Sequence, residues 1–283
     1  MYKVSYHNHS DFSDGKNSMS EMVAEAYAAG FTHYAFTDHN HIPGQEGWTV
    51  SKNMAADYLA EIEKLKNLYD GKMKIYSGIE KDWFYKQGEE EIFTPEQRKR
   101  LDIVIGSVHQ LKGSKTFDFI DGDPFTYDCV FKEQFDSDPH AFVYEYFASM
   151  EEMIINMRPT LVAHPDIIRI HNASGKYFSE KNPYYYDLIE KLARTMKKYG
   201  CVSEINGGGD FRHHNGVFYP SDDLLNIFRE TGIPLTIGLD AHSTQMLTAY
   251  YDKSLTMLKN AGYKEISVFE NGSWQSIDIK EFQ

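Results

Sequence analysis

Short β-forming runs alternate with helical segments about seven times along the chain, and this alternation constrains the fold more than any other feature. The runs are rich in Val, Ile, Tyr and Phe, which favour strands. Strands separated by helices pair in parallel, with the helices covering the sheet. The expected strands are residues 2–6, 34–37, 74–78, 102–108, 160–163, 201–205 and 235–239.

Helix boundaries are marked by cap residues. Ser18 with Glu21 forms a capping-box pattern, and Gly30 is placed to end that helix. Further helix starts are predicted where a cap residue precedes proline, at Thr94-Pro95, Asp138-Pro139 and Asn182-Pro183. The pattern predicts an α/β protein, either a (β/α) barrel or a doubly wound parallel sheet, and we prefer the barrel.

No linker or low-complexity segment divides the chain, so we expect a single domain over residues 1–283. The core barrel should cover about residues 1–245. A helix and a hairpin should follow in residues 246–283, because Asn271-Gly272 between two β-rich runs is a hairpin signal. Residues 112–137 are the least regular region and should form an extended loop.

Composition excludes several classes of protein. The formal charge of −13 argues against a protein built to bind nucleic acid, which needs clustered Lys and Arg. The two cysteines, Cys129 and Cys201, form no CxxC pair, so a disulfide framework or thiolate metal site is not expected. There is no apolar run of membrane-spanning length and no export signal, which favours a cytoplasmic protein without a membrane partner.

Nearly every expected strand ends in a side chain that can bind metal. A (β/α) barrel builds its active site at these carboxyl ends. A lone histidine there is more often structural, but the coincidence across strands, and the spacing of two within the His7/His9 and Asp240/His242 pairs, favours a metal site. The candidates in strand order are His7 and His9; Asp38 and His39; Glu80; His109; His164; Glu204 and Asn206; Asp240 and His242.

The ligand types narrow the chemistry. Histidine and carboxylate without thiolate suit Zn²⁺, Mn²⁺ or Fe²⁺, and there are more ligands than one tetrahedral ion can use, so at least two ions are implied. Clustered divalent ions typically serve phosphoester hydrolysis.

Taken in order, the motifs resemble those of the polymerase and histidinol phosphatase (PHP) family. They span residues 7 to 242, and "GSVHQL" and "EINGGGDFR" are similar to the stand-alone histidinol-phosphate phosphatases of that family. The resemblance implies a distorted barrel of seven strands with three metal ions. The motifs are HxH at His7, SDG at Asp14, TDH at His39, Glu80, SVH at His109, AHPD at His164 and DAH at His242.

The resemblance also implies roles for individual residues. The first ion would be held by His7, His9, Glu80 and Asp240, with Glu80 bridging to a second ion held by His109 and His164. His39 and His242 would hold the third ion with Asp14, although Asp11 could take that place or orient a ligand histidine. Arg169 and Arg212 would bind phosphate. Glu80, Asp240 and His242 would be catalytic, with a metal-bridging hydroxide attacking phosphorus in line.

The implied activity is hydrolysis of L-histidinol phosphate, a small-molecule substrate, in L-histidine biosynthesis. The alternatives are a phosphatase for another small ester, such as a nucleotide or phosphotyrosine, a metal-dependent nuclease module, and a non-catalytic metal-binding barrel. Recognition of histidinol would need an acidic or polar partner and an aromatic wall, for which residues 117–127, with Asp118, Asp121 and Asp123, are the candidate segment. The sequence leaves the oligomeric state open.

Overall fold

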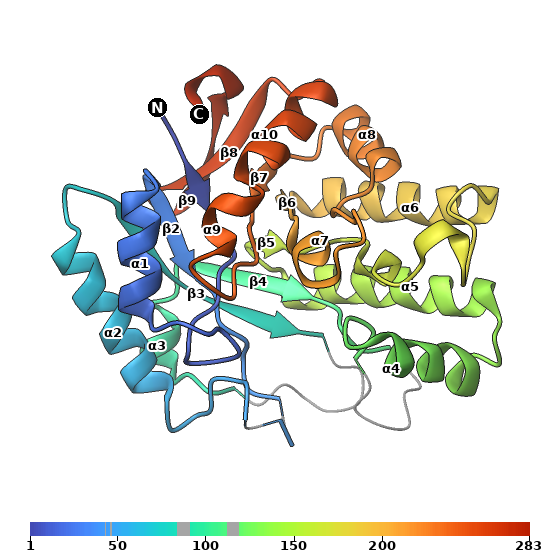
Figure 1. Cartoon of the computed structure of the whole chain (residues 1–283), viewed down its shortest axis with the longest axis horizontal. Coiled ribbons are helices and arrows are strands. Elements are labelled where there is room, and N and C mark those ends of the chain that lie inside the picture. The colour runs from blue at the N-terminus through green and yellow to red at the C-terminus, as the bar shows by residue number, and fades with distance from the viewer. Residues whose placement is uncertain (43, 46, 84–90, 112–118) are drawn as a thin grey trace.

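Seven parallel strands form one sheet in which each strand pairs with the next along the chain. The structure, a computed structural model, describes residues 1–42, 44, 45, 47–83, 91–111 and 119–283 (Figure 1). All seven predicted strands are present. They are β1 (Val4–Ser5), β2 (His33–Phe36), β3 (Lys74–Asp82), β4 (Ile103–Ser107), β5 (Leu161–Val162), β6 (Ser203–Ile205) and β7 (Leu235–Ile237).

The sheet curls into a nearly closed barrel because the end of β7 and the residues after it pair with the chain after β1. The backbone N–H of Tyr6 donates to the carbonyl of Ile237 at 3.2 Å, and that of Asp240 donates to the carbonyl of His7 at 2.8 Å. The sequential strand order and this closure confirm the predicted barrel over the doubly wound sheet.

Strand β3 is longer than the sequence predicted, and the difference matters for the site. It continues to Asp82, with Glu80 opposite Ile105 and Asp82 opposite Ser107 of β4. Side chains two residues apart on a strand point to the same face. Glu80 and Asp82 therefore face the same side of the sheet.

Helices surround the strands (Figure 1). The predicted caps are confirmed: the Ser18 side chain accepts from the N–H of Glu21, and Asp138 and Asn182 cap the helices that begin at the prolines after them. None of the helices in the described segments is long and apolar enough to cross a membrane. The helices are α1 (Met19–Ala28), α2 (Ala55–Leu68), α3 (Pro95–Arg98), α4 (Pro124–Cys129), α5 (Pro139–Met157), α6 (Pro183–Tyr199), α7 (Gly208–His213), α8 (Asp222–Thr231), α9 (Met246–Ala249) and α10 (Tyr251–Asn260).

One expectation was partly wrong. The segment expected to be an extended loop contains α4 and a π-helical turn (Val130–Gln134). The helix forms because Asp123 caps it and proline occupies its first position. Residues 112–118 of this segment lie outside the described residues.

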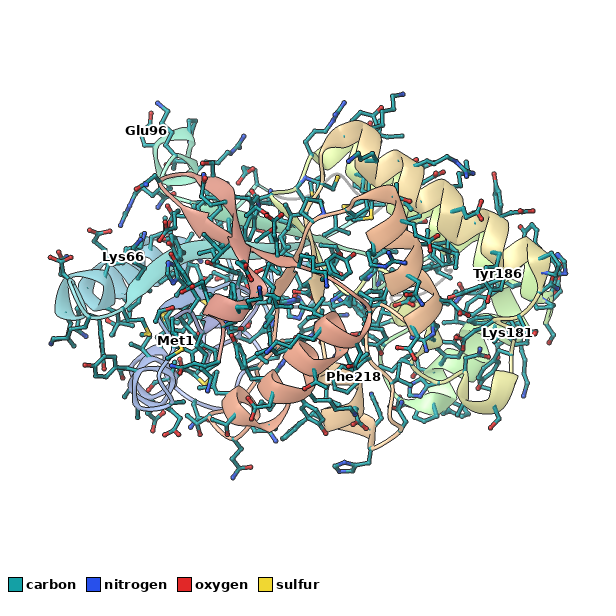
Figure 2. The ribbon with its side chains drawn as sticks, turned by 90° about the horizontal axis from the view of Figure 1, so that it is seen from above. Met1, Lys66, Glu96, Lys181, Tyr186 and Phe218 are labelled. Carbon is teal, nitrogen blue, oxygen red and sulfur yellow. The ribbon has the colours of Figure 1, made fainter. Side chains whose placement is uncertain are left out.

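The predicted C-terminal hairpin, β8 (Glu265–Glu270) and β9 (Ser273–Asp278), covers the end of the barrel where the strands begin. The indole N–H of Trp274 donates to the carbonyl of Thr160, just before β5, and the hydroxyl of Tyr76 donates to the carbonyl of Phe269. Figure 2, which looks from above, shows the hairpin lying across the strands. The hairpin closes the end opposite the carboxyl ends of the strands, so we propose that it folds with the barrel as one domain.

Candidate metal centre

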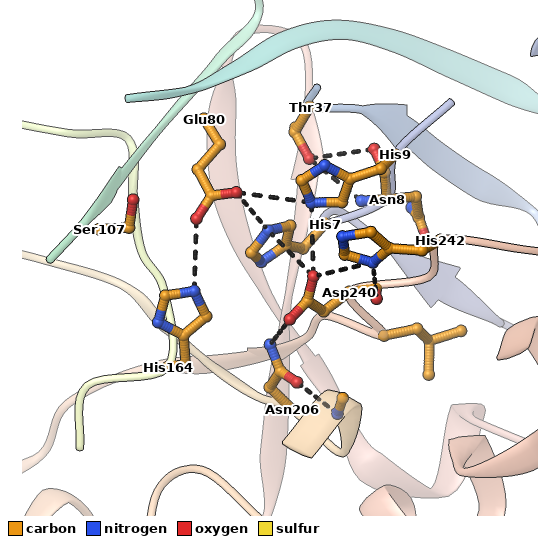
Figure 3. A network of polar contacts seen from close by, with 12 residues as sticks. His7, Asn8, His9, Thr37, Glu80, Ser107, His164, Asn206, Asp240 and His242 are labelled. Carbon is orange, nitrogen blue, oxygen red and sulfur yellow. Dashed lines mark hydrogen bonds and ion pairs between the residues drawn. The ribbon is translucent and has the colours of Figure 1, made fainter. Parts of the chain in front are cut away.

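The nine residues predicted to bind metal meet at the carboxyl end of the barrel. Figure 3 shows how some of them converge from separate strands and loops: His7, His9, Glu80, His164, Asp240 and His242. Seven of the nine are buried, whereas the side chain of His242 is 15% exposed and that of Asp14 is 30% exposed. The buried seven are His7, His9, His39, Glu80, His109, His164 and Asp240.

A first group surrounds one oxygen of Glu80. Its Oε2 atom lies 3.1 Å from Nε2 of His7 and 3.4 Å from Nε2 of His9. Oδ1 of Asp240 lies 3.4 Å from the same nitrogen of His9 and 3.7 Å from Nε2 of His7. These four residues are the ones that the resemblance placed around the first ion.

The other oxygen of Glu80 faces a second group. Its Oε1 atom lies 3.3 Å from Nε2 of His164 and 3.9 Å from Nε2 of His109. One carboxylate thus presents its two oxygens to two sets of histidines, the geometry that a bridging ligand requires.

A third group forms at the exposed edge, around Asp14. Oδ2 of Asp14 lies 2.9 Å from Nε2 of His242 and 3.8 Å from Nε2 of His39. Asp11, the alternative left open by the sequence, is exposed and lines a surface groove with Asp57 and Lys64 of α2. The position of Asp14 supports its choice as the third-group carboxylate, and its role as a ligand stays a prediction.

The spacing within the three groups fits divalent ions. Ligand atoms at roughly 2.0–2.2 Å from one tetrahedral ion lie about 3.4 Å apart, close to the separations around Glu80. Within the described residues, both ring nitrogens of His9 and Oε1 of Glu80 are buried without a hydrogen-bond partner. Buried polar atoms are rarely left unpaired. The donor set is therefore suited to divalent metal ions.

The electrostatics of the cluster also favour cations. Burial would lower the pKa of a histidine, yet the surrounding carboxylates, Glu80 and Asp14 foremost, raise the pKa of His39 to about 10. Burial would raise the pKa of Asp240, but Arg212 and His7 hold it well below its ordinary value. The carboxylates are thus ionised at neutral pH, and the site attracts positive charge.

Glu204 of β6, one of the strand-end candidates of the sequence analysis, is hydrogen-bonded to residues of this cluster. Its carboxylate accepts hydrogen bonds from Nδ1 of His7 at 3.0 Å, from the backbone N–H of His164 at 3.1 Å and from the side-chain amide of Asn206 at 2.8 Å. With Nδ1 occupied, the free ring nitrogen of His7 is Nε2, which faces the first group.

Asp82 contacts the cluster and was missed by the sequence analysis. Its Oδ1 atom lies 2.5 Å from Nδ1 of His109, and its side chain is 1% exposed. The signal in the sequence was its spacing of two from Glu80, which would have been informative only if β3 had been predicted to extend that far.

Three consecutive glycines after β6 let the backbone pass close to the cluster. A Cβ atom on Gly208 would lie 2.8 Å from Oδ2 of Asp240, and one on Gly209 would lie 2.6 Å from the hydroxyl of Tyr219. At Gly208 and Gly209 the backbone passes so close to Asp240 and Tyr219 that there is no room for a side chain, which explains these two glycines of the run.

The structure brings one of the two predicted phosphate-binding arginines to the cluster. Nη2 of Arg212 lies 3.2 Å from Oδ2 of Asp240, and its side chain is 27% exposed. Arg169 instead donates to Glu180 at 2.7 Å and to Asp166 at 3.4 Å, and within the described residues no hydrogen bond or ion pair joins it to the nine cluster residues. The geometry supports Arg212, whereas phosphate binding by Arg169 stays a prediction without a contact to support it.

Aromatic and acidic side chains lie beside the cluster. The ring of Trp48 is 5.2 Å from that of His39 and 5.3 Å from that of Phe119. Oδ2 of Asp121 lies 3.8 Å from Nε2 of His109. Of the other acidic residues expected to recognise substrate, Asp123 is occupied in capping α4, and Asp118 lies outside the described residues.

Comparison with known proteins agrees with this geometry. The family model described as PHP domain matches residues 5–208. The histidinol-phosphatase of Lactococcus lactis subsp. lactis (strain IL1403) is 28% identical over 281 residues, which cover 95% of each chain.

Two solved structures share the fold. A candidate histidinol phosphatase of Listeria monocytogenes has a TM-score of 0.77 at 20% identity, over 89% of this chain and 99% of that one. The histidinol phosphate phosphatase of Lactococcus lactis subsp. lactis, solved with Zn, L-histidinol and phosphate, has a TM-score of 0.67 at 22% identity, over 96% of this chain and 98% of that one. With the family match extending over more than half of its length, the chain belongs to the PHP domain family.

Proposed function

We propose that this protein is a metal-dependent phosphomonoesterase that hydrolyses L-histidinol phosphate to L-histidinol and phosphate, a step of L-histidine biosynthesis. The observation that carries the proposal is the set of buried histidine and carboxylate groups at the carboxyl end of the barrel, in which Glu80 faces two groups. The substrate assignment is supported by the Lactococcus relative, which matches this chain over 95% of both lengths.

We further propose three ions per chain, of Zn²⁺, Mn²⁺ or Fe²⁺. His7, His9, Glu80 and Asp240 would hold the first ion. Ions bound in such a cluster make hydroxide available at neutral pH and stabilise the charge on phosphoryl oxygens. The second ion would be held by Glu80, His109 and His164, and the third by Asp14, His39 and His242.

The residues around these ions have distinct tasks. Asp240 presents one oxygen to His7 and His9 and the other to Arg212. The carboxylate can accept a proton from water, and the neighbouring guanidinium of Arg212 can donate hydrogen bonds to a phosphate oxygen. Nδ1 of His242 lies 2.8 Å from the carbonyl of Asp240 and donates a hydrogen bond to it, so this nitrogen already carries a proton. The other ring nitrogen, Nε2, faces Asp14. In the overall reaction the phosphorus–oxygen bond to the alcohol breaks, water supplies the new oxygen, and the alcohol leaves with a proton.

The alcohol part of the substrate would lie toward Trp48, Phe119 and Asp121. An imidazole ring can pack against the two aromatic side chains, and a carboxylate at the rim can pair with an ammonium group. We propose that this side of the cluster selects histidinol. We also propose that the enzyme acts in the cytoplasm on this small-molecule substrate, which cell fractionation would check.

The proposal is tested by measuring phosphate release from L-histidinol phosphate against nucleotides, sugar phosphates and phosphotyrosine, with the ion content of the same preparation. We expect histidinol phosphate to have the highest kcat/KM and more than one transition-metal ion per chain. A higher kcat/KM for another ester would overturn the substrate assignment and leave the metal site standing. A protein that stays inactive with all these esters after loading with each of Zn²⁺, Mn²⁺ and Fe²⁺ would overturn the phosphatase assignment.

A further inference from the structure

Asp82 lies between histidines assigned to two different ion positions. It is the last residue of β3, two residues beyond Glu80, and it is only 3% exposed. Strand pairing places it opposite Ser107, two residues before His109. The ring of His39 approaches from the neighbouring strand, with its centroid 5.7 Å from that of His109. A single buried carboxylate is thus in reach of one ring from the second group and one from the third.

The contact between Asp82 and His109 is a hydrogen bond and not a shared ion. Oδ1 of Asp82 lies 2.5 Å from Nδ1 of His109. Two atoms bound to the same tetrahedral ion would be about 3.4 Å apart, so no ion fits between these two. The Nδ1–H of His109 therefore donates to Asp82, and the lone pair on Nε2 faces Glu80 and the second position.

The second oxygen of Asp82 faces His39. Oδ2 lies 3.7 Å from Nδ1 of His39, whose other ring nitrogen faces Asp14 at 3.8 Å. Both Oδ2 of Asp82 and Nδ1 of His39 are buried, and neither has a hydrogen-bond partner in the part of the chain that is described. Nδ1 of His39 also lies 3.3 Å from Oε2 of Glu80, so the carboxylates of Glu80 and Asp82 both face this nitrogen.

We propose that Asp82 is a positioning residue for two ligands, fixing His109 at the second ion position and His39 at the third, so that the two positions are coupled. The proposal rests on the proposed metal assignment. With His109 held at the second position, its Nδ1–H would fix Asp82, and Asp82 would offer its second oxygen to His39. Glu204 is the matching group for His7, but its partners belong to the first and second groups, and its contacts do not include His39.

The test compares Asp82→Asn with Glu204→Gln in the full-length protein, using Zn²⁺ alone as the probe. Ion content after dialysis and calorimetric titration give the number and affinity of bound ions without reference to activity. Loss of a group that orients a ligand lowers metal affinity by roughly 10–100-fold. We expect Asp82→Asn to weaken two positions together and Glu204→Gln to leave the third unchanged. Wild-type affinities in Asp82→Asn would overturn the proposal, and weakening of one position only would overturn the coupling.

Two further measurements keep the test decisive if Asp82→Asn folds poorly. His109→Gln and His164→Gln both remove a ligand of the second ion, but only His109 contacts Asp82, so the third position should weaken more in His109→Gln. Equal third-position affinities in the two variants would contradict the coupling. In the wild type, nitrogen-15 spectra of the imidazole rings should show His109 protonated at Nδ1, and a proton at Nε2 instead would refute the hydrogen bond.

These outcomes are separate from failure of the proposed function. A wild-type protein that binds no Zn²⁺ would refute the metal assignment itself. A wild-type protein that binds the ions and hydrolyses the ester, paired with an Asp82→Asn variant of unchanged ion affinity, would refute only the role of Asp82.

Discussion

Oε2 of Glu204 occupies the space beside Gly238 in which any other residue would place its Cβ atom. The glycine thereby makes room for the carboxylate that binds Nδ1 of His7 at 3.0 Å. A residue in the strand connection after β7 thus controls the orientation of a predicted metal ligand after β1. The requirement for glycine here is one of space and not of backbone conformation.

The first prediction concerns Gly238→Ala. The new methyl group should displace Glu204, release Nδ1 of His7 and weaken the first ion position by roughly 10–100-fold, the usual cost of losing such a partner. Zinc titration and kcat/KM for histidinol phosphate measure the effect. Gly47→Ala is the matched control, because a Cβ atom there meets nothing within 4 Å among the described residues. Equal zinc affinity in the two variants would contradict the role given to Gly238.

A second prediction concerns Glu80→Gln. Because Oε1 and Oε2 face different histidine groups, the substitution should lower the ion content at two positions. We expect kcat to fall by roughly 10²–10³-fold, the effect of removing one charge-stabilising group from an active site. Circular dichroism should show the barrel still folded. Glu230→Gln, at a side chain that is 67% exposed, should behave as the wild type. Full ion content in Glu80→Gln would exclude a bridging role.

Much of the site could be predicted because most of the proposed ligands lie next to an expected strand. Once the alternation of strands and helices indicates a barrel, His7, His39, His109 and His164 must meet at one end, whatever the details of packing. The identity of the third-group carboxylate could not be derived in this way. Asp11 and Asp14 share a loop without periodicity, and only the path of that loop brings Asp14 to His242.

Residues whose role depends on tertiary contacts were harder to predict from the sequence. Asp82 was missed because β3 extends four residues beyond its predicted end at Gly78, to a position where the parallel pairing with β4 continues. Arg169 was expected at the phosphate site from its motif. Its guanidinium is directed by Glu180, eleven residues away, and no local pattern indicates that ion pair.

The third prediction concerns Arg212→Lys. Lysine keeps the positive charge but loses the planar pair of donors that matches two phosphate oxygens. We expect kcat/KM to fall by roughly 10–100-fold, with weaker inhibition by inorganic phosphate, at unchanged zinc content. Arg194→Lys is the control, because that side chain is 63% exposed and pairs with Glu190. If Arg212→Lys leaves phosphate inhibition unchanged, Arg212 does not bind the phosphoryl group.

The last prediction concerns pH and the opposite end of the barrel, where His33 begins β2. Burial lowers the pKa of His33 below its ordinary value near 6.5, although the hydrogen bond from its ring to Glu270, at 3.2 Å, acts in the other direction. The unfolded chain therefore binds a proton more readily than the folded protein. This group's contribution to the free energy of unfolding is full above pH 6.5 and is lost as the pH falls from 6.5 through the lowered folded value.

Denaturant unfolding of the wild type and of His33→Gln at pH 7.5 and pH 5.5 tests this sign. Every other histidine is common to both proteins, so the difference between their pH dependences isolates His33. We expect His33→Gln to lose less stability than the wild type on acidification. A larger loss in the variant would mean that the ion pair with Glu270 outweighs burial and that protonation of His33 stabilises the fold.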